Sequence, residues 1–148
     1  MFIALSFWVL ALLCCGFAAA VGGRDGRRVA AIYVLGCLAT LVALWMESDW
    51  SHTHLATFAV DAVLLLAFWR VALGSPQWFP LWVAGFHLVT VVSHVASFFA
   101  PGYAFKLYFF LQSFWSVPML LAMVAGVALD WRAGFADEPD ASPPNRSS

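Results

Sequence analysis

Two histidines lie inside an otherwise apolar stretch of this sequence, where side chains that can carry a proton are rare. His87 and His94 fall within residues 81–99, which contain no Lys, Arg, Asp or Glu and have about the length of a helix that crosses a bilayer. At 100° per residue, both histidines share one face of that helix, an arc of about 120°, with Thr90, Ser93 and Ser97. Because polar groups are costly in hydrocarbon unless they have partners, this face is expected to point into protein or a wet cavity.

A single acidic residue, Asp61, stands in another apolar stretch, residues 55–73. It lies about six residues, or roughly 9 Å, from the start of that stretch, and His94 lies about as far from the end of its own. Consecutive spans tend to pack together, so the sequence predicts that Asp61 and His94 meet at one level in the membrane. Arg70 falls on the opposite side of the helix from Asp61 and is expected to extend to the membrane surface.

Two interpretations of this polar pair remain open. In the first, Asp61 and His94 form a structural pair that fixes the register of two helices. In the second, they form a proton- or ion-responsive site, because histidine titrates near neutral pH and a carboxylate beside it can hold or release the proton. His87 and Thr90 would then extend a route across the membrane, and Gln112, in the last apolar stretch, would complete a hydrogen-bonded column.

The polar segment 47–54 raises the question of a metal or a haem. His52 and His54 lie there with Glu47, and imidazole and carboxylate ligands together suit zinc, copper or iron. Haem b needs an axial ligand on each side of its iron, and two histidines on one helix cannot both bind the same iron. A haem would therefore need a second copy of the chain, or a histidine from segment 47–54, and the cofactor remains undetermined.

The composition specifies the class of protein that must position these residues. The chain has 148 residues, of which 64% are hydrophobic and 10% charged, with a mean hydropathy of +0.88. A soluble domain of this size has no place for so much apolar surface. We therefore expect an all-α, polytopic transmembrane bundle over residues 1–129, followed by a disordered cytoplasmic tail over residues 130–148. The expected spans are residues 1–21, 29–46, 55–73, 81–99 and 105–129.

The basic residues predict how the bundle is threaded. Five crossings leave the two chain ends on opposite sides, and six arginines then share one side against Lys106 on the other. These are Arg24, Arg27, Arg28, Arg70, Arg132 and Arg146. The excess of basic residues on cytoplasmic segments places the N-terminus outside and the C-terminus in the cytoplasm. Residues 22–28 are predicted to form a tight basic turn whose Arg24, Arg27 and Arg28 anchor the topology at anionic lipid headgroups.

Other functional classes find no support in the sequence. Nucleophile, zinc-protease, phosphate-loop and dinucleotide motifs are missing, so an enzymatic role is not indicated. The net charge is −1 without an extended basic patch, which argues against nucleic acid as a partner. The three cysteines form no C-x-x-C pair and suit small packing positions. Ala122 and Gly126, four residues apart, allow close packing of the last span against a neighbour.

The favoured function is that of a small integral membrane protein, an accessory or assembly subunit that acts through its helix faces. A chain this short encloses little cavity volume, so we expect a homo-oligomer or a larger membrane complex, with the lipid bilayer as the other partner. A bacterial inner (plasma) membrane is the expected location. The alternative is a proton-coupled transporter or channel that uses Asp61, His94 and His87, and a further alternative is a haem- or metal-binding redox membrane protein.

Overall fold

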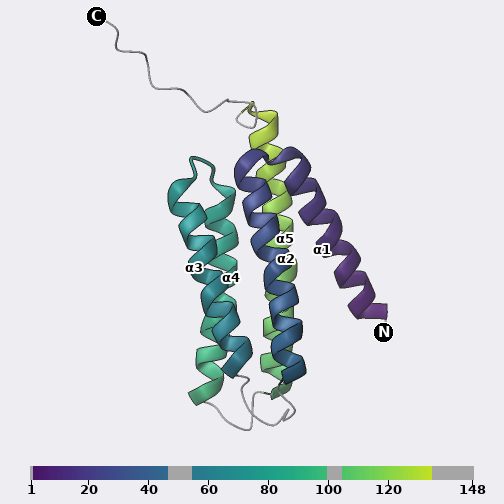
Figure 1. Cartoon of the computed structure of the whole chain (residues 1–148), viewed down its shortest axis with the longest axis vertical. Helices are drawn as coiled ribbons and strands as arrows, with labels where there is room; N and C mark the ends of the chain where they lie inside the picture. The colour runs from purple at the N-terminus through teal and green to yellow at the C-terminus, as the bar shows by residue number, and fades with distance from the viewer. Residues whose placement is uncertain (1, 47–54, 100–104, 135–148) are drawn as a thin grey trace, which may run out of the picture.

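The structure, a computed structural model, describes residues 2–46, 55–99 and 105–134 as a bundle of five helices (Figure 1). All regular secondary structure in these ranges is helical, which confirms the predicted all-α class. The helices are α1 (Phe2–Val21), α2 (Gly23–Met46), α3 (Leu55–Gly74), α4 (Phe79–Phe99) and α5 (Phe105–Arg132).

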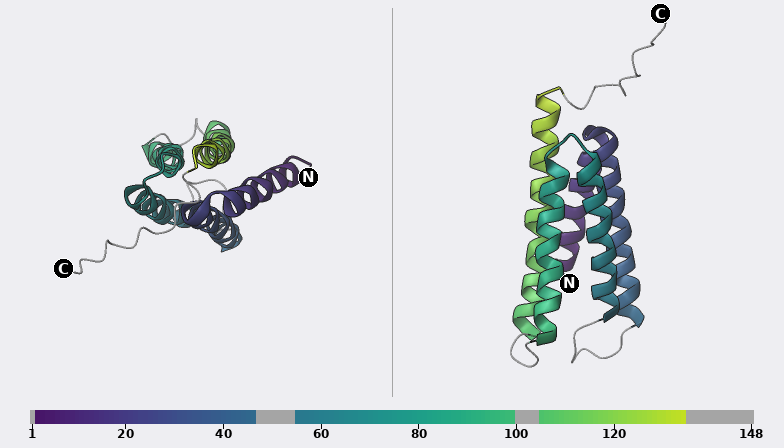
Figure 2. Two further views of the ribbon diagram at one scale, coloured as in Figure 1. Left: turned by 90° about the horizontal axis from the view of Figure 1, so that it is seen from above. Right: turned by 90° about the vertical axis from the view of Figure 1, so that its left-hand side faces the viewer.

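The helices pack in chain order around a closed circuit. Each helix contacts the next one along the chain, and α5 returns to contact α1. Helices α2 to α5 run up and down along the long axis, whereas α1 leans away from them toward its N-terminal end (Figures 1 and 2). The described buried residues of α1 accordingly begin at Ala11 and continue to Ala18, in the half that meets the bundle.

Four of the five helices are long and apolar enough to cross a membrane. The qualifying segments are Gly23–Trp45, Leu55–Gly74, Phe79–Ser97 and Phe114–Arg132. The described apolar part of α1, Leu5–Val21, is shorter than each of these four segments. These segments indicate a membrane protein that crosses the bilayer several times, and the crossing by α1 stays a prediction.

The link between the first two helices differs from the predicted turn. The sequence predicts a tight turn over residues 22–28, but α2 already begins at Gly23, so Arg24, Arg27 and Arg28 lie in its first two turns. The reversal is confined to two glycines: Gly23 has a φ of 59°, and the Gly22 amide donates to the Ala18 carbonyl at 2.9 Å. A left-handed glycine is a common end of a helix, and it lets the next helix start at once.

The buried interior divides into an apolar and a polar zone. The apolar zone contains residues of all five helices toward the end of the bundle where the α1–α2 corner lies, and it includes Ala18, Val29, Phe68, Phe79 and Val127. The polar zone joins the first half of α3 to the second half of α4, toward the opposite end. Because α2 and α3 run in opposite directions, Arg28 near the start of α2 and Arg70 near the end of α3 lie at the same end of the bundle as the α1–α2 corner.

Candidate functional site

One narrow face of α3 is buried, and it is largely polar. The buried residues of α3 are Thr57, Asp61 and Phe68, which recur at helical spacing and therefore lie along one stripe. Asp61 is only 6% exposed and Thr57 only 2%. The remaining residues of α3 are at least partly exposed, as expected for a helix whose other faces meet lipid. The acid therefore points into the bundle.

His94 on α4 meets the carboxylate of Asp61. Its Nε2 lies 2.8 Å from Asp61 Oδ2, and the His94 residue has no exposed surface. The pairing that helix direction and depth predicted is present. Whichever group carries the proton, this contact is a hydrogen bond between two groups removed from water, and it ties α3 to α4.

His87 reaches the same residue from two turns away on α4. Its Nε2 lies 3.0 Å from the backbone oxygen of Asp61 and 3.8 Å from Oδ1. A backbone carbonyl can only accept, so His87 donates through Nε2–H. The sequence predicts His87 as an extension of a route across the membrane, whereas in the structure His87 contacts Asp61 directly. The seven-residue spacing of His87 and His94 is the feature that could have indicated this contact, because it puts both imidazoles on one face with room for a single residue of α3 between them.

Two phenylalanines of α3 pack against the imidazoles. Phe68 meets the His87 ring edge-on, with centroids 5.3 Å apart, and Phe58 lies 5.9 Å from the His94 ring in a tilted arrangement. We call Asp61, His87 and His94 the Asp61 cluster. The two aromatic rings shield this cluster along the α3 surface, and apolar surroundings strengthen the electrostatic interactions inside it.

The contacts of the Asp61 cluster determine where a proton can reside. His87 is held as a donor to the Asp61 backbone, so the exchangeable proton belongs to the pair of Asp61 Oδ2 and His94 Nε2. A neutral imidazole and an ionised carboxylate together carry one negative charge. When the pair holds one additional proton, its net charge is zero. Without that proton the pair carries a net negative charge, which is costly in a buried site. The net charge of this buried contact therefore depends on one shared proton.

Thr57 supplies a buried hydroxyl one turn from Asp61. Its Oγ1 has no hydrogen-bond partner among the described residues. Replacement by valine keeps the shape and removes the hydroxyl, so Thr57→Val is expected to leave the free energy of unfolding unchanged or raise it by about 1 kcal/mol. Thermal unfolding in detergent measures this. A clear loss of stability would mean that the hydroxyl holds a water or another group in the folded protein.

The other hydroxyls of the predicted polar face have mixed roles. Thr90 is buried on the histidine face of α4. Ser93 Oγ donates to the Val89 carbonyl at 2.8 Å, and Ser97 Oγ donates to the His94 carbonyl at 2.7 Å. Bonds of this kind satisfy a serine within its own helix. Gln112 belongs to α5, but its side chain lies outside the described part, so the hydrogen-bonded column remains a prediction.

The proposed metal ligands His52, His54 and Glu47 lie outside the described residues. Within the described ranges, no group of three or more His, Cys, Asp or Glu side chains is placed to hold a metal ion. Cys14 and Cys15 are buried in the packing of α1, and Cys37 on α2 is partly buried. All three are free thiols, and Cys14 and Cys15 belong to the apolar core, in line with their predicted packing role.

Comparison of the chain with family models, with curated proteins and with solved structures found no match.

Proposed function

We propose that this chain is a small multi-pass membrane protein in which the Asp61 cluster binds and releases a proton, coupling that proton to transport or to signalling across the membrane. The observation that carries the proposal is the 2.8 Å contact between Asp61 Oδ2 and His94 Nε2, at residues that are 6% and 0% exposed. Ionisable residues inside a membrane protein are costly and commonly mark ion or proton pathways. A carboxylate paired with an imidazole is suited to proton exchange near neutral pH.

The orientation proposed for the chain puts the arginine-bearing end of the bundle in the cytoplasm of a bacterial inner membrane. Arg28, Arg70 and Arg132 all lie near that end, which is the distribution typical of cytoplasmic segments. Exposed tryptophans near helix ends support a bilayer setting, since tryptophan favours the membrane–water interface. Trp45 lies toward one end of the bundle, and Trp69 and Trp131 lie toward the other. In this orientation Asp61 and His94 lie closer to the outer face.

A second candidate function is that of an accessory subunit held in a larger complex or homo-oligomer through its helix faces. Two observations favour it. Ser93 and Ser97 are hydrogen-bonded within α4 and need no transported species to satisfy them. Helix α1 meets the bundle mainly through its second half, so its leaning first half has exposed apolar side chains, such as Leu5 and Val9, available for a membrane partner. On this reading the Asp61 cluster holds α3 against α4 and does not exchange protons.

Infrared spectroscopy of the purified protein in lipid nanodiscs distinguishes the two candidates. A site that exchanges protons is expected to change with pH either the carboxylic-acid band of Asp61 or the imidazole ring bands of His94, because the proton belongs to the pair. Both sets of bands are assigned by their change in Asp61→Asn. Bands of both groups that stay constant with pH would contradict the proton site and favour the structural role.

A further inference from the structure

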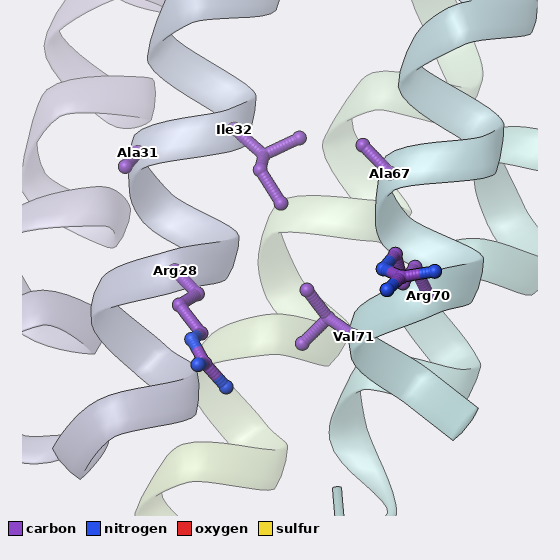
Figure 3. Close-up of a pocket in the computed structure, with 6 residues that line it drawn as sticks. All are labelled: Arg28, Ala31, Ile32, Ala67, Arg70 and Val71. Atoms are coloured by element: carbon purple, nitrogen blue, oxygen red, sulfur yellow. The ribbon is translucent and has the colours of Figure 1, made fainter. Parts of the chain in front are cut away.

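A groove between α2 and α3 lies at the arginine-bearing end of the bundle, away from the Asp61 cluster. Figure 3 shows its lining: Arg28 and Arg70 on facing helices, with the side chains of Ile32 and Val71 pointing into the space between them. Ala31 and Ala67 complete the lining, and their small side chains leave the groove open. The groove thus combines two guanidinium groups with an apolar wall.

The two arginines are incompletely neutralised. Arg28 Nη1 lies 3.3 Å from Asp25 Oδ1, an ion pair within one helix, and the Arg28 side chain remains 49% exposed. Arg70 is exposed, and no side chain in the described ranges forms an ion pair with it. The groove therefore holds two positive charges against the single negative charge of Asp25. Two guanidiniums on opposite walls suit a phosphate group, because arginine binds phosphate oxygens through paired N–H donors.

The depth of the groove matches the level of lipid headgroups. Arg28 and Arg70 each lie about one to one and a half turns from the end of their helix, roughly 6–8 Å below it. Farther along both helices the outward residues are apolar and exposed, among them Leu35 on α2 and Leu66 on α3. A molecule whose phosphate sits between the arginines therefore has a continuous apolar surface leading toward the middle of the bilayer.

We propose that this groove binds one anionic phospholipid of the phosphatidylglycerol type, with its phosphate between Arg28 and Arg70 and an acyl chain against Ile32, Ala67 and Val71. Basic pockets between membrane helices favour anionic headgroups, and the apolar wall adds selectivity for a lipid over a soluble anion. The bound lipid links α2 to α3 at the end of the bundle opposite the Asp61–His94 contact. The proposal requires membrane insertion but is independent of proton exchange at the Asp61 cluster.

Native mass spectrometry of the full chain, released from detergent micelles, tests the site by titration with phosphatidylglycerol or phosphatidylcholine. We expect one tightly retained phosphatidylglycerol and weak retention of phosphatidylcholine. Arg28→Gln combined with Arg70→Gln is expected to weaken phosphatidylglycerol binding by about 25-fold, since each basic residue contributes about five-fold. Arg132→Gln, which removes an exposed charge from the same end of the bundle but outside the groove, is expected to change binding less than about two-fold.

A variant that keeps both arginines tests the apolar wall even if the double variant does not fold. Ala67→Leu fills the groove and is expected to weaken retention of phosphatidylglycerol, again by about five-fold, while inorganic phosphate competes poorly at millimolar concentration. Equal retention of the two lipids would overturn the proposal. So would a loss in Arg132→Gln as large as that in the double variant, full retention in Ala67→Leu, or displacement of the lipid by phosphate alone.

Discussion

Asp61→Asn is expected to abolish proton flux through the reconstituted protein while the bundle stays folded. Asparagine has nearly the size of aspartate, and its amide can still hydrogen-bond to His94 Nε2, so the contact between α3 and α4 persists. The asparagine side chain cannot take up or release a proton in the physiological pH range. Hydrogen bonds between membrane helices contribute about 0.6 kcal/mol on average and at most about 1.7, so the change in stability should be small beside the complete loss of flux.

The measurement uses lipid vesicles that contain the protein and a pH-sensitive dye, with a potassium diffusion potential as the driving force. Asp25→Asn is the matched control, because it also removes one carboxylate but in the first turn of α2, where Asp25 pairs with Arg28 and lies outside the Asp61 cluster. It should keep the wild-type flux. Flux that persists in Asp61→Asn would remove Asp61 from the pathway. A wild-type chain without flux would contradict autonomous transport, and the infrared titration then decides whether the site exchanges protons at all.

Gly126→Ala is expected to cause a large loss of stability although it adds only one methyl group. A Cβ at Gly126 would collide with the Cβ of Phe79 and lie 3.2 Å from its Cα, so the obstacle includes backbone rather than only a flexible side chain. Phe79 is 1% exposed and has no space to retreat into. Helix α5 must then move away from α4, and over-packing of this kind costs about 1–3 kcal/mol. Thermal unfolding in detergent, followed by tryptophan fluorescence, measures the loss.

Gly85→Ala is the matched control for this change. Gly85 lies in α4, the helix that carries Phe79, but a Cβ there meets nothing within 4 Å. Alanine is the better helix former, by about 0.5–1 kcal/mol, so the control should be neutral or slightly stabilising. Equal melting temperatures for the two variants would show that α4 and α5 do not approach each other as closely as the structure describes.

The composition determined the class of protein, and the arrangement of apolar stretches along the sequence determined the number of helices. Apolar stretches of about twenty residues, separated by polar or glycine- and proline-containing segments, specify helices whatever their packing partners are. The contact of Asp61 with His94 was also predictable, because antiparallel neighbours bring the start of one helix beside the end of the next. Ala122 and Gly126 likewise indicated close packing on α5, although the sequence could not identify Phe79 as the residue opposite Gly126.

Only the tertiary structure decided which groups complete the site and the groove. The His87 side chain donates to the backbone carbonyl of Asp61. Every residue has a backbone carbonyl, so the sequence does not indicate which one accepts. The early start of α2 depends on the left-handed conformation of Gly23. The basic residues around Gly23 favoured the prediction of a turn at this position. Arg28 and Arg70 are 42 positions apart in the sequence, and they line one groove because α2 and α3 are packed side by side. Sequence periodicity specifies the face on which a residue lies, whereas helix rotation and packing determine which residue of another helix it meets.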